Sequence, residues 1–343
     1  MFHSVKPTQL SVIEGLIPPI RQKSFYQFDN NSSPYIYDIT ATSTHCFISD
    51  SIHQITSFAY TNSNLTFSGK LAYHTDTITK LKIHKNQFII SSSKDGRIAL
   101  WDLRTPNSQP TNVFQAKNSE PLLSFDINNS GTILAAGTEL VEEDAKILFW
   151  DLRQPFHVAF EFIESHNDDV TQIQFHPTND SCFISGSVDG LICNFELKSF
   201  NEDDELVGVI NSGSSINKAG YFGPSAEYVY CLTHTETFSL WGLSDVNLLC
   251  DMGDIRQDDS KGGTIQIDYA VDCQFDFSTN RLYLFAGSNR GGISILHVAI
   301  NELQLCQTLN GGHSDIVRSV IWNPQINIFL SGGEDSKLCI WGL

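Results

Sequence analysis

Residues 91–104 have the sequence SSSKDGRIALWDLR, and this stretch decides the fold. The pattern predicts a β-strand that ends in serines, a tight Asp-Gly turn, and an alternating strand that closes on Trp-Asp. The same pattern returns at residues 185–195 and 331–341. In each copy a serine lies four residues before the aspartate, and an aromatic residue lies six residues after it. The chain therefore contains an internal repeat of antiparallel strands.

The weaker copies give the repeat its period. The closing positions of successive copies are residues 101, 150, 195, 241, 296 and 341, so the steps are 49, 45, 46, 55 and 45. Four short strands with their turns need a period of about 45 residues. With this repeated pattern of strands and turns, the chain resembles the WD-repeat family of β-propellers. We therefore expect an all-β fold: a single seven-bladed WD-repeat β-propeller over residues 18–343, preceded by a loosely held N-terminal tail, residues 1–17.

The closure of the ring can also be predicted. The final copy stops at Leu343, directly after its third strand. In related propellers an N-terminal strand supplies the missing fourth strand of the last blade, and residues 20–28 are the candidate here. The physical reason is that an unclosed ring leaves two exposed sheet edges, which pairing of the chain ends removes.

A histidine, a serine and an aspartate recur together in three copies of the repeat, and in an enzyme these residue types could form a Ser-His-Asp triad. An active site would occur once, so we predict a structural role and no catalysis. The family resemblance implies hydrogen bonds that link the loop before the first strand to the second and third strands. Phe195 cannot donate a hydrogen bond, so the middle set should be the weakest. The three sets are His74, Ser91, Asp95 and Trp101; His166, Ser185 and Asp189; and His313, Ser331, Asp335 and Trp341.

The tetrapeptide Trp-Asp-Leu-Arg occurs twice, at residues 101–104 and 150–153. It is similar to the Trp-Asp-x-Arg box of propellers that serve as substrate receptors of cullin-4 ubiquitin ligases. That resemblance implies that Arg104 and Arg153 help to dock the damaged-DNA-binding adaptor of the ligase. A structural alternative is that each arginine pairs with a neighbouring carboxylate.

Composition limits the classes of partner. The chain has 21 Lys and Arg against 39 Asp and Glu, a net charge of −18. This excess of acid argues against direct nucleic-acid binding, because phosphate contacts require basic residues. No signal peptide, membrane span, zinc or calcium spacing, or phosphate loop is present, and eight scattered cysteines favour buried reduced thiols. We expect a protein of the nucleus and/or cytoplasm without metal or cofactor.

The expected fold gathers acidic residues on one rim of the ring. The field over the channel mouth should attract a Lys- and Arg-rich peptide, although an acidic rim that only maintains solubility is an equal alternative. The first functional hypothesis is a non-enzymatic scaffold or adaptor that binds a basic segment of a ribosomal or chromatin protein; the alternative is the cullin-4 substrate receptor. The candidate rim residues are Glu139, Glu142, Glu143, Asp251, Asp254, Asp258 and Asp259.

Overall fold

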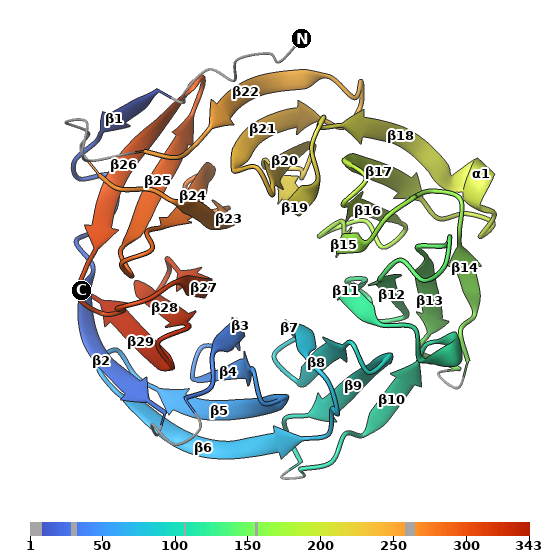
Figure 1. Ribbon diagram of the computed structural model, residues 1–343, viewed down its shortest axis with the longest axis horizontal. Coiled ribbons are helices and arrows are strands. Elements are labelled where there is room, and N and C mark those ends of the chain that lie inside the picture. The colour runs from blue at the N-terminus through green and yellow to red at the C-terminus, as the bar shows by residue number, and fades with distance from the viewer. Residues whose placement is uncertain (1–8, 29–32, 106–107, 155–156, 258–264) are drawn as a thin grey trace.

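The computed structural model describes residues 9–28, 33–105, 108–154, 157–257 and 265–343. Seven antiparallel β-sheets stand around a central channel, with the first strand of each blade innermost (Figure 1). This confirms the predicted all-β seven-bladed propeller. A 3-10 helix (Lys117–Ser119) and a helix of one turn, α1 (Glu202–Glu205), are the helices in the described residues.

Each of the first four blades contains four consecutive strands. Blade one comprises β3 (Ile36–Ala41), β4 (His45–Asp50), β5 (Gln54–Tyr60) and β6 (Leu65–Ala72). Blade two comprises β7 (Ile78–His84), β8 (Phe88–Ser93), β9 (Arg97–Asp102) and β10 (Asn112–Gln115). Blade three comprises β11 (Leu122–Ile127), β12 (Ile133–Thr138), β13 (Ile147–Asp151) and β14 (Phe160–Phe162). Blade four comprises β15 (Val170–Phe175), β16 (Cys182–Ser187), β17 (Leu191–Glu196) and β18 (Leu206–Asn211).

The last three blades include the two places where the N-terminal segment joins the ring. Blade five comprises β19 (Ile216–Phe222), β20 (Tyr228–Thr233), β21 (Thr237–Gly242) and β22 (Leu248–Asp254). Blade six comprises β23 (Tyr269–Asp276), β24 (Arg281–Gly287), β25 (Ile293–Ala299), β26 (Glu302–Leu309) and an added β1 (Leu10–Val12). Blade seven comprises β27 (Val317–Asn323), β28 (Ile328–Gly333), β29 (Lys337–Gly342) and β2 (Arg21–Gln27).

The ring closes as the sequence predicts. Strand β2 pairs antiparallel with β29, and Phe25 lies opposite Cys339. The N-terminal strand thus provides the fourth strand of blade seven, so the ring has no gap between its first and last sheets.

The predicted tail is wrong in part. Residues 10–12 form β1, which pairs in parallel with β26 and makes blade six a five-stranded sheet. Ile17 is also buried, and it packs with Trp322 and Trp341 between blades six and seven. The prediction failed because this segment is short and is held in place by contacts with strands nearly 300 residues away. No local sequence pattern indicates such contacts.

Apolar side chains between neighbouring sheets hold the blades together. The seam between blades three and four is rich in phenylalanine, with Phe149, Phe162, Phe183 and Phe195 all fully buried. Phe195 stacks on Phe183 with ring centroids 4.7 Å apart. Burial of each such ring contributes about 1.5–3 kcal/mol. Phe195, which occupies the position of Trp101 and Trp341 in the other blades, therefore stabilises the apolar seam between blades three and four.

Polar side chains form a second set of bridges where the innermost strands line the channel, which we call the inner collar. Carboxylate and amide groups of one blade accept hydrogen bonds from main-chain N–H groups of the next, and two lysines pair with aspartates across seams. At the seam between blades seven and one, the Ser319 hydroxyl donates to the Asp38 carboxylate. Every seam of the ring has such a bridge. In ring order the bridges are Asp38–Leu81, Lys82–Asp126, Asp126–Phe175, Gln174–Tyr221, Lys218–Asp272, Gln274–Trp322 and Ser319–Asp38.

Candidate functional site

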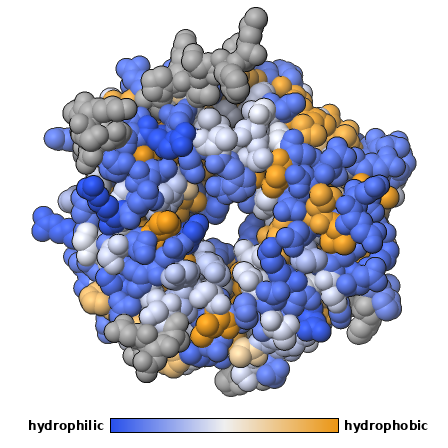
Figure 2. All heavy atoms as spheres, viewed as in Figure 1, coloured by the Kyte–Doolittle hydropathy of each residue, from blue (hydrophilic) through white to orange (hydrophobic). Residues whose placement is uncertain are grey.

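Antiparallel order divides the loops between two faces of the ring. The turns between second and third strands and the links between blades lie on one face, here called the upper face, which includes residues 94–96 and 139–146. The other turns form the lower face, which includes residues 103–105 and 152–154. Figure 2 shows the channel open at the centre of the ring, with hydrophilic residues over much of the surrounding surface.

The histidine sets share one geometry in blades two, four and seven. Each histidine Nδ1 lies 3.0 Å from its aspartate, and each Nε2 lies 2.7 Å from its serine Oγ. The carboxylate accepts a hydrogen bond from Nδ1–H, so the unprotonated Nε2 accepts one from the serine O–H. The aspartate also accepts the N–H of the residue after the histidine, which fixes the link between blades against the hairpin. The members are His74, Ser91 and Asp95; His166, Ser185 and Asp189; and His313, Ser331 and Asp335.

The tryptophans differ between blades. Trp341 Nε1 donates to Ser331 Oγ over 2.8 Å, so blade seven holds the complete four-member set. Trp101 is equally buried, but its Nε1 has no hydrogen-bond partner among the described residues, so the predicted bond in blade two is not formed. The residue before the histidine gives the reason. A Cβ on Gly312 would lie 2.4 Å from the Trp341 ring, and blade two has Tyr73 in this place.

The pKa of the aspartate in each set is consistent with an ionised carboxylate that accepts hydrogen bonds. Burial alone would raise the pKa of Asp95, but hydrogen bonds from His74 and from two main-chain N–H groups outweigh this effect, so the pKa lies below its usual value. The same balance lowers the pKa of Asp189 and Asp335. The serine hydroxyl is fully buried and faces the histidine inside the blade, where no substrate reaches it. These are the contacts of a scaffold.

The strongest acidic feature of the upper face is the turn between β12 and β13, residues 139–146, which we call the acidic hairpin. Val141 and Asp144 exchange two main-chain hydrogen bonds and present Glu142 and Glu143 at the tip, both exposed. Leu140 and Val141 beside them are 36% and 39% exposed, which the sequence did not predict. The hairpin is joined to blade four, because Leu140 N–H donates to the Asp169 carboxylate over 2.7 Å.

The other predicted rim residues contribute less. Glu139 pairs with Lys94 Nζ at 3.1 Å, and Asp254 makes a bidentate pair with Arg256. Asp251 is wrongly assigned to the rim: it lies within β22, the outermost strand of blade five, because this strand continues to Asp254 before the link to blade six begins. Asp258 and Asp259 lie outside the described residues. Among the predicted rim residues that the structure describes, Glu142 and Glu143 are therefore the exposed carboxylates on the upper face without an ion pair.

Arg104 and Arg153 lie at equivalent positions on the lower face, directly after β9 and β13. In each, Nε is 2.8 Å and Nη2 is 2.6 Å from the aspartate two residues earlier. The hydrogen bonds from Arg104 lower the pKa of Asp102 to about 2. Both arginines remain exposed, at 61% and 73% of the side chain. The structural alternative, an internal ion pair, is thus present together with an accessible guanidinium.

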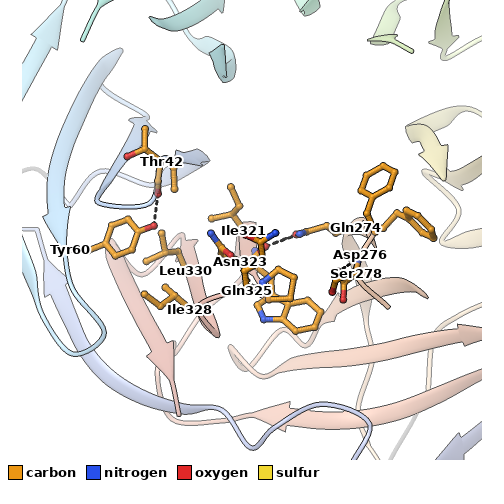
Figure 3. A pocket seen from close by; sticks show the side chains of 15 residues that line it. Thr42, Tyr60, Gln274, Asp276, Ser278, Ile321, Asn323, Gln325, Ile328 and Leu330 are labelled. Carbon is orange, nitrogen blue, oxygen red and sulfur yellow. Dashed lines mark hydrogen bonds between the residues drawn. The ribbon is translucent and has the colours of Figure 1, made fainter. Parts of the chain in front are cut away.

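A pocket of about 480 Å³ opens where blades six, seven and one meet (Figure 3). Its polar groups are engaged in scaffold contacts: the Tyr60 hydroxyl donates to the Thr42 carbonyl, and Gln274 bonds the main chain of Trp322. The Asp276 carboxylate accepts hydrogen bonds from the Ser278 hydroxyl and main chain. Sequence patterns did not predict this pocket, because three separate blades form it.

The described residues show neither a cluster of metal ligands nor a membrane-spanning helix. No group of three or more His, Cys, Asp or Glu side chains there is arranged to hold a metal ion. Within the same ranges no helix has the length and apolarity needed to cross a membrane. All eight cysteines are free thiols, and six of them are buried.

Comparisons with known proteins agree with this architecture. The family described as "WD domain, G-beta repeat" matches residues 53–102, 158–195 and 303–342. The WD repeat-containing protein 89 homolog of Dictyostelium discoideum is 31% identical over 90% of this chain and 82% of its own length. The WD repeat-containing protein GTS1 of Arabidopsis thaliana is 32% identical over 91% of this chain and 82% of its own length. Proteins of this kind generally act as interaction scaffolds and are typically non-enzymatic, and this chain belongs to the WD-repeat family of β-propellers.

Proposed function

We propose that this propeller is a non-enzymatic scaffold or adaptor whose upper face captures a basic segment of a partner protein. The observation that carries the proposal is the acidic hairpin, where Glu142 and Glu143 project without a salt bridge among the described residues. Two lysines of the same face already pair with other carboxylates, Lys94 with Glu139 and Lys146 with Glu120. A cationic partner therefore meets uncompensated carboxylates.

The exposed aliphatic residues define the partner further. Leu140 and Val141 lie beside the two glutamates on one turn, so a fitting segment carries an apolar side chain between basic ones. Each exposed ion pair contributes about 0.2–1 kcal/mol, and burial of one aliphatic side chain contributes about 1.5–3 kcal/mol. The charges mainly raise the association rate and select the partner, and the apolar contact prolongs the complex.

The test compares charge reversal on the two faces. Glu142→Lys/Glu143→Lys and the control Asp203→Lys/Asp245→Lys change the net charge equally, but the control residues are exposed on lower-face connections. Tagged wild type and variants are used as baits, and captured proteins are quantified by mass spectrometry. The hairpin variant should lose proteins with basic segments that the control retains, without a change in melting temperature. Equal capture by both variants would refute the proposal.

The second candidate is a substrate receptor of a cullin-4 ubiquitin ligase. Its support is the pair of exposed, identically held guanidinium groups of Arg104 and Arg153 in adjacent blades of the lower face. Arg104→Ala/Arg153→Ala should abolish co-purification with the damaged-DNA-binding adaptor. Arg256→Ala is the matched control, because Arg256 makes the same bidentate pair with Asp254 on the upper face. No adaptor with wild type would remove this candidate.

A further inference from the structure

The N-terminal segment is attached to blade six at two separate places. Strand β1 lies outside β26 on the circumference of the ring (Figure 1) and covers its Leu303–Leu305 edge. Farther along, Ile17 and Ile20 are buried on the opposite side of blade six, toward blade seven. The two attachments are therefore independent contacts on different sides of one sheet.

The second attachment is the strong one. Ile20 is 1% exposed, and its main-chain N–H and carbonyl both bond to the Gln307 side chain, at 2.9 Å and 2.5 Å. It leads directly into β2, which closes the ring. This part of the segment cannot leave without opening blade seven.

The first attachment is slight by comparison. Strand β1 has three residues, runs parallel to β26, and leaves Val12 56% exposed. Leu10 alone packs against the apolar cluster between blades five and six. Hydrogen bonds join Leu303 N–H to the Gln9 carbonyl and Ile13 N–H to the Leu305 carbonyl, each 2.9 Å. Parallel pairing is the less stable kind per residue, and so short a strand adds little.

A hinge lies between the two attachments. Gly15 has φ +74°, a conformation that glycine adopts without strain, and no atom lies within 4 Å of a Cβ built on it. Residues 9–13 can therefore swing away while Ile17, Ile20 and β2 stay in place. Their departure leaves an unpaired strand edge with an apolar site for one side chain.

We propose that the Leu303–Leu305 edge of β26 is a docking site for an extended segment of a partner protein, and that residues 9–13 occupy it until the partner displaces them. The site fits an uncharged strand that runs parallel to β26 and has an aliphatic residue at the Leu10 position. Main-chain pairing fixes the direction and register of the segment, and burial of the side chain at the Leu10 site adds affinity and selectivity. This surface is independent of the acidic hairpin.

The test uses the full chain with residues 9–13 detached from β26. Leu10→Asp places a charge against the apolar cluster, and Ile13→Pro removes a donor, so the double variant frees the edge. The probe is a fluorescent peptide with the sequence of residues 9–14, QLSVIE, followed by anisotropy. A tethered segment competes at an effective concentration in the millimolar range, so wild type should bind about tenfold more weakly or worse than the variant. The same peptide with Leu10→Asp should not bind.

Hydrogen exchange of the Leu303 amide measures directly whether this edge of β26 is paired. Its amide should lose protection in the variant and regain it with the peptide, since it donates to Gln9 in the intact chain. Ile13→Pro alone is a milder variant that should change both readouts in the same direction. Equal peptide binding by wild type and variant, or a deprotected Leu303 without binding, overturns the proposal. A wild-type dimer that Leu10→Asp abolishes also overturns it, because the occupant would then be a second copy.

Discussion

The two buried tryptophans that end the third strands of blades two and seven give a sharp test of the hydrogen-bond sets. Trp101 and Trp341 are each 2% exposed, so replacement by phenylalanine removes comparable apolar contact at both sites. Their polar atoms differ: Trp341 Nε1 donates to Ser331 Oγ, while Trp101 Nε1 has no partner in the described part of the chain. The difference between the two variants therefore isolates the hydrogen bond.

The magnitude follows from these contacts. Trp341→Phe loses a buried hydrogen bond and leaves Ser331 Oγ without that donor, a cost of about 1–3 kcal/mol beyond the packing loss. Trp101→Phe removes an N–H whose unpartnered burial already costs about 1–3 kcal/mol, so part of the packing loss is offset. Trp341→Phe should therefore lower the free energy of unfolding by about 2–6 kcal/mol more than Trp101→Phe, the sum of the two ranges.

The assay is urea unfolding followed by far-ultraviolet circular dichroism, in which the backbone of the remaining sheets gives most of the signal. The comparison holds if both variants keep the wild-type dependence of unfolding free energy on urea. Equal destabilisation by the two substitutions, or a larger cost for Trp101→Phe, would refute the assignment of Trp341 as the one of this pair bonded to serine.

Three further predictions concern the same scaffold. Gly312→Ala should lower the unfolding free energy by about 2 kcal/mol or more in the urea assay, because its Cβ would displace the Trp341 ring. The folded-state pKa of Asp335 lies below the ordinary 3.8, so its stabilisation is complete above that pH and is lost as pH falls below it; Asp335→Asn should therefore weaken the acid dependence of the urea midpoint. Asp126→Ala should lower the free energy of unfolding by about 1–3 kcal/mol, since it leaves the buried Phe175 N–H of the next blade without an acceptor and Lys82 without its partner; a loss below 1 kcal/mol would contradict the inner collar.

Much of the fold could be predicted from the sequence because each repeat carries its own local instructions. The Asp-Gly turn at residues 95–96 and the histidine–serine–aspartate spacing are local, and they specify blades two, four and seven directly. Closure by residues 20–28 followed from the exposed edges of an open ring. The bond of Trp101 could not be foreseen, since it depends on whether Tyr73 leaves space for the indole.

The candidate site was harder to predict, because it depends on which groups neutralise each other across blades. The sequence indicated the acid of residues 139–143, but the pairing of Glu139 with Lys94 appears only when blades two and three are adjacent. The inner collar was missed for the same reason: Asp38 and Ser319 are 281 residues apart. Strand β1 has no alternating run long enough to predict a strand alone.

The most direct test of the central claim is the dissociation constant of a captured partner's basic segment, measured as a synthetic peptide with three proteins at two salt concentrations. Wild type and Asp203→Lys/Asp245→Lys should bind alike, and Glu142→Lys/Glu143→Lys should bind about tenfold more weakly or worse, with the difference shrinking at high salt. Equal dissociation constants for all three proteins would contradict the acidic hairpin as the capture site.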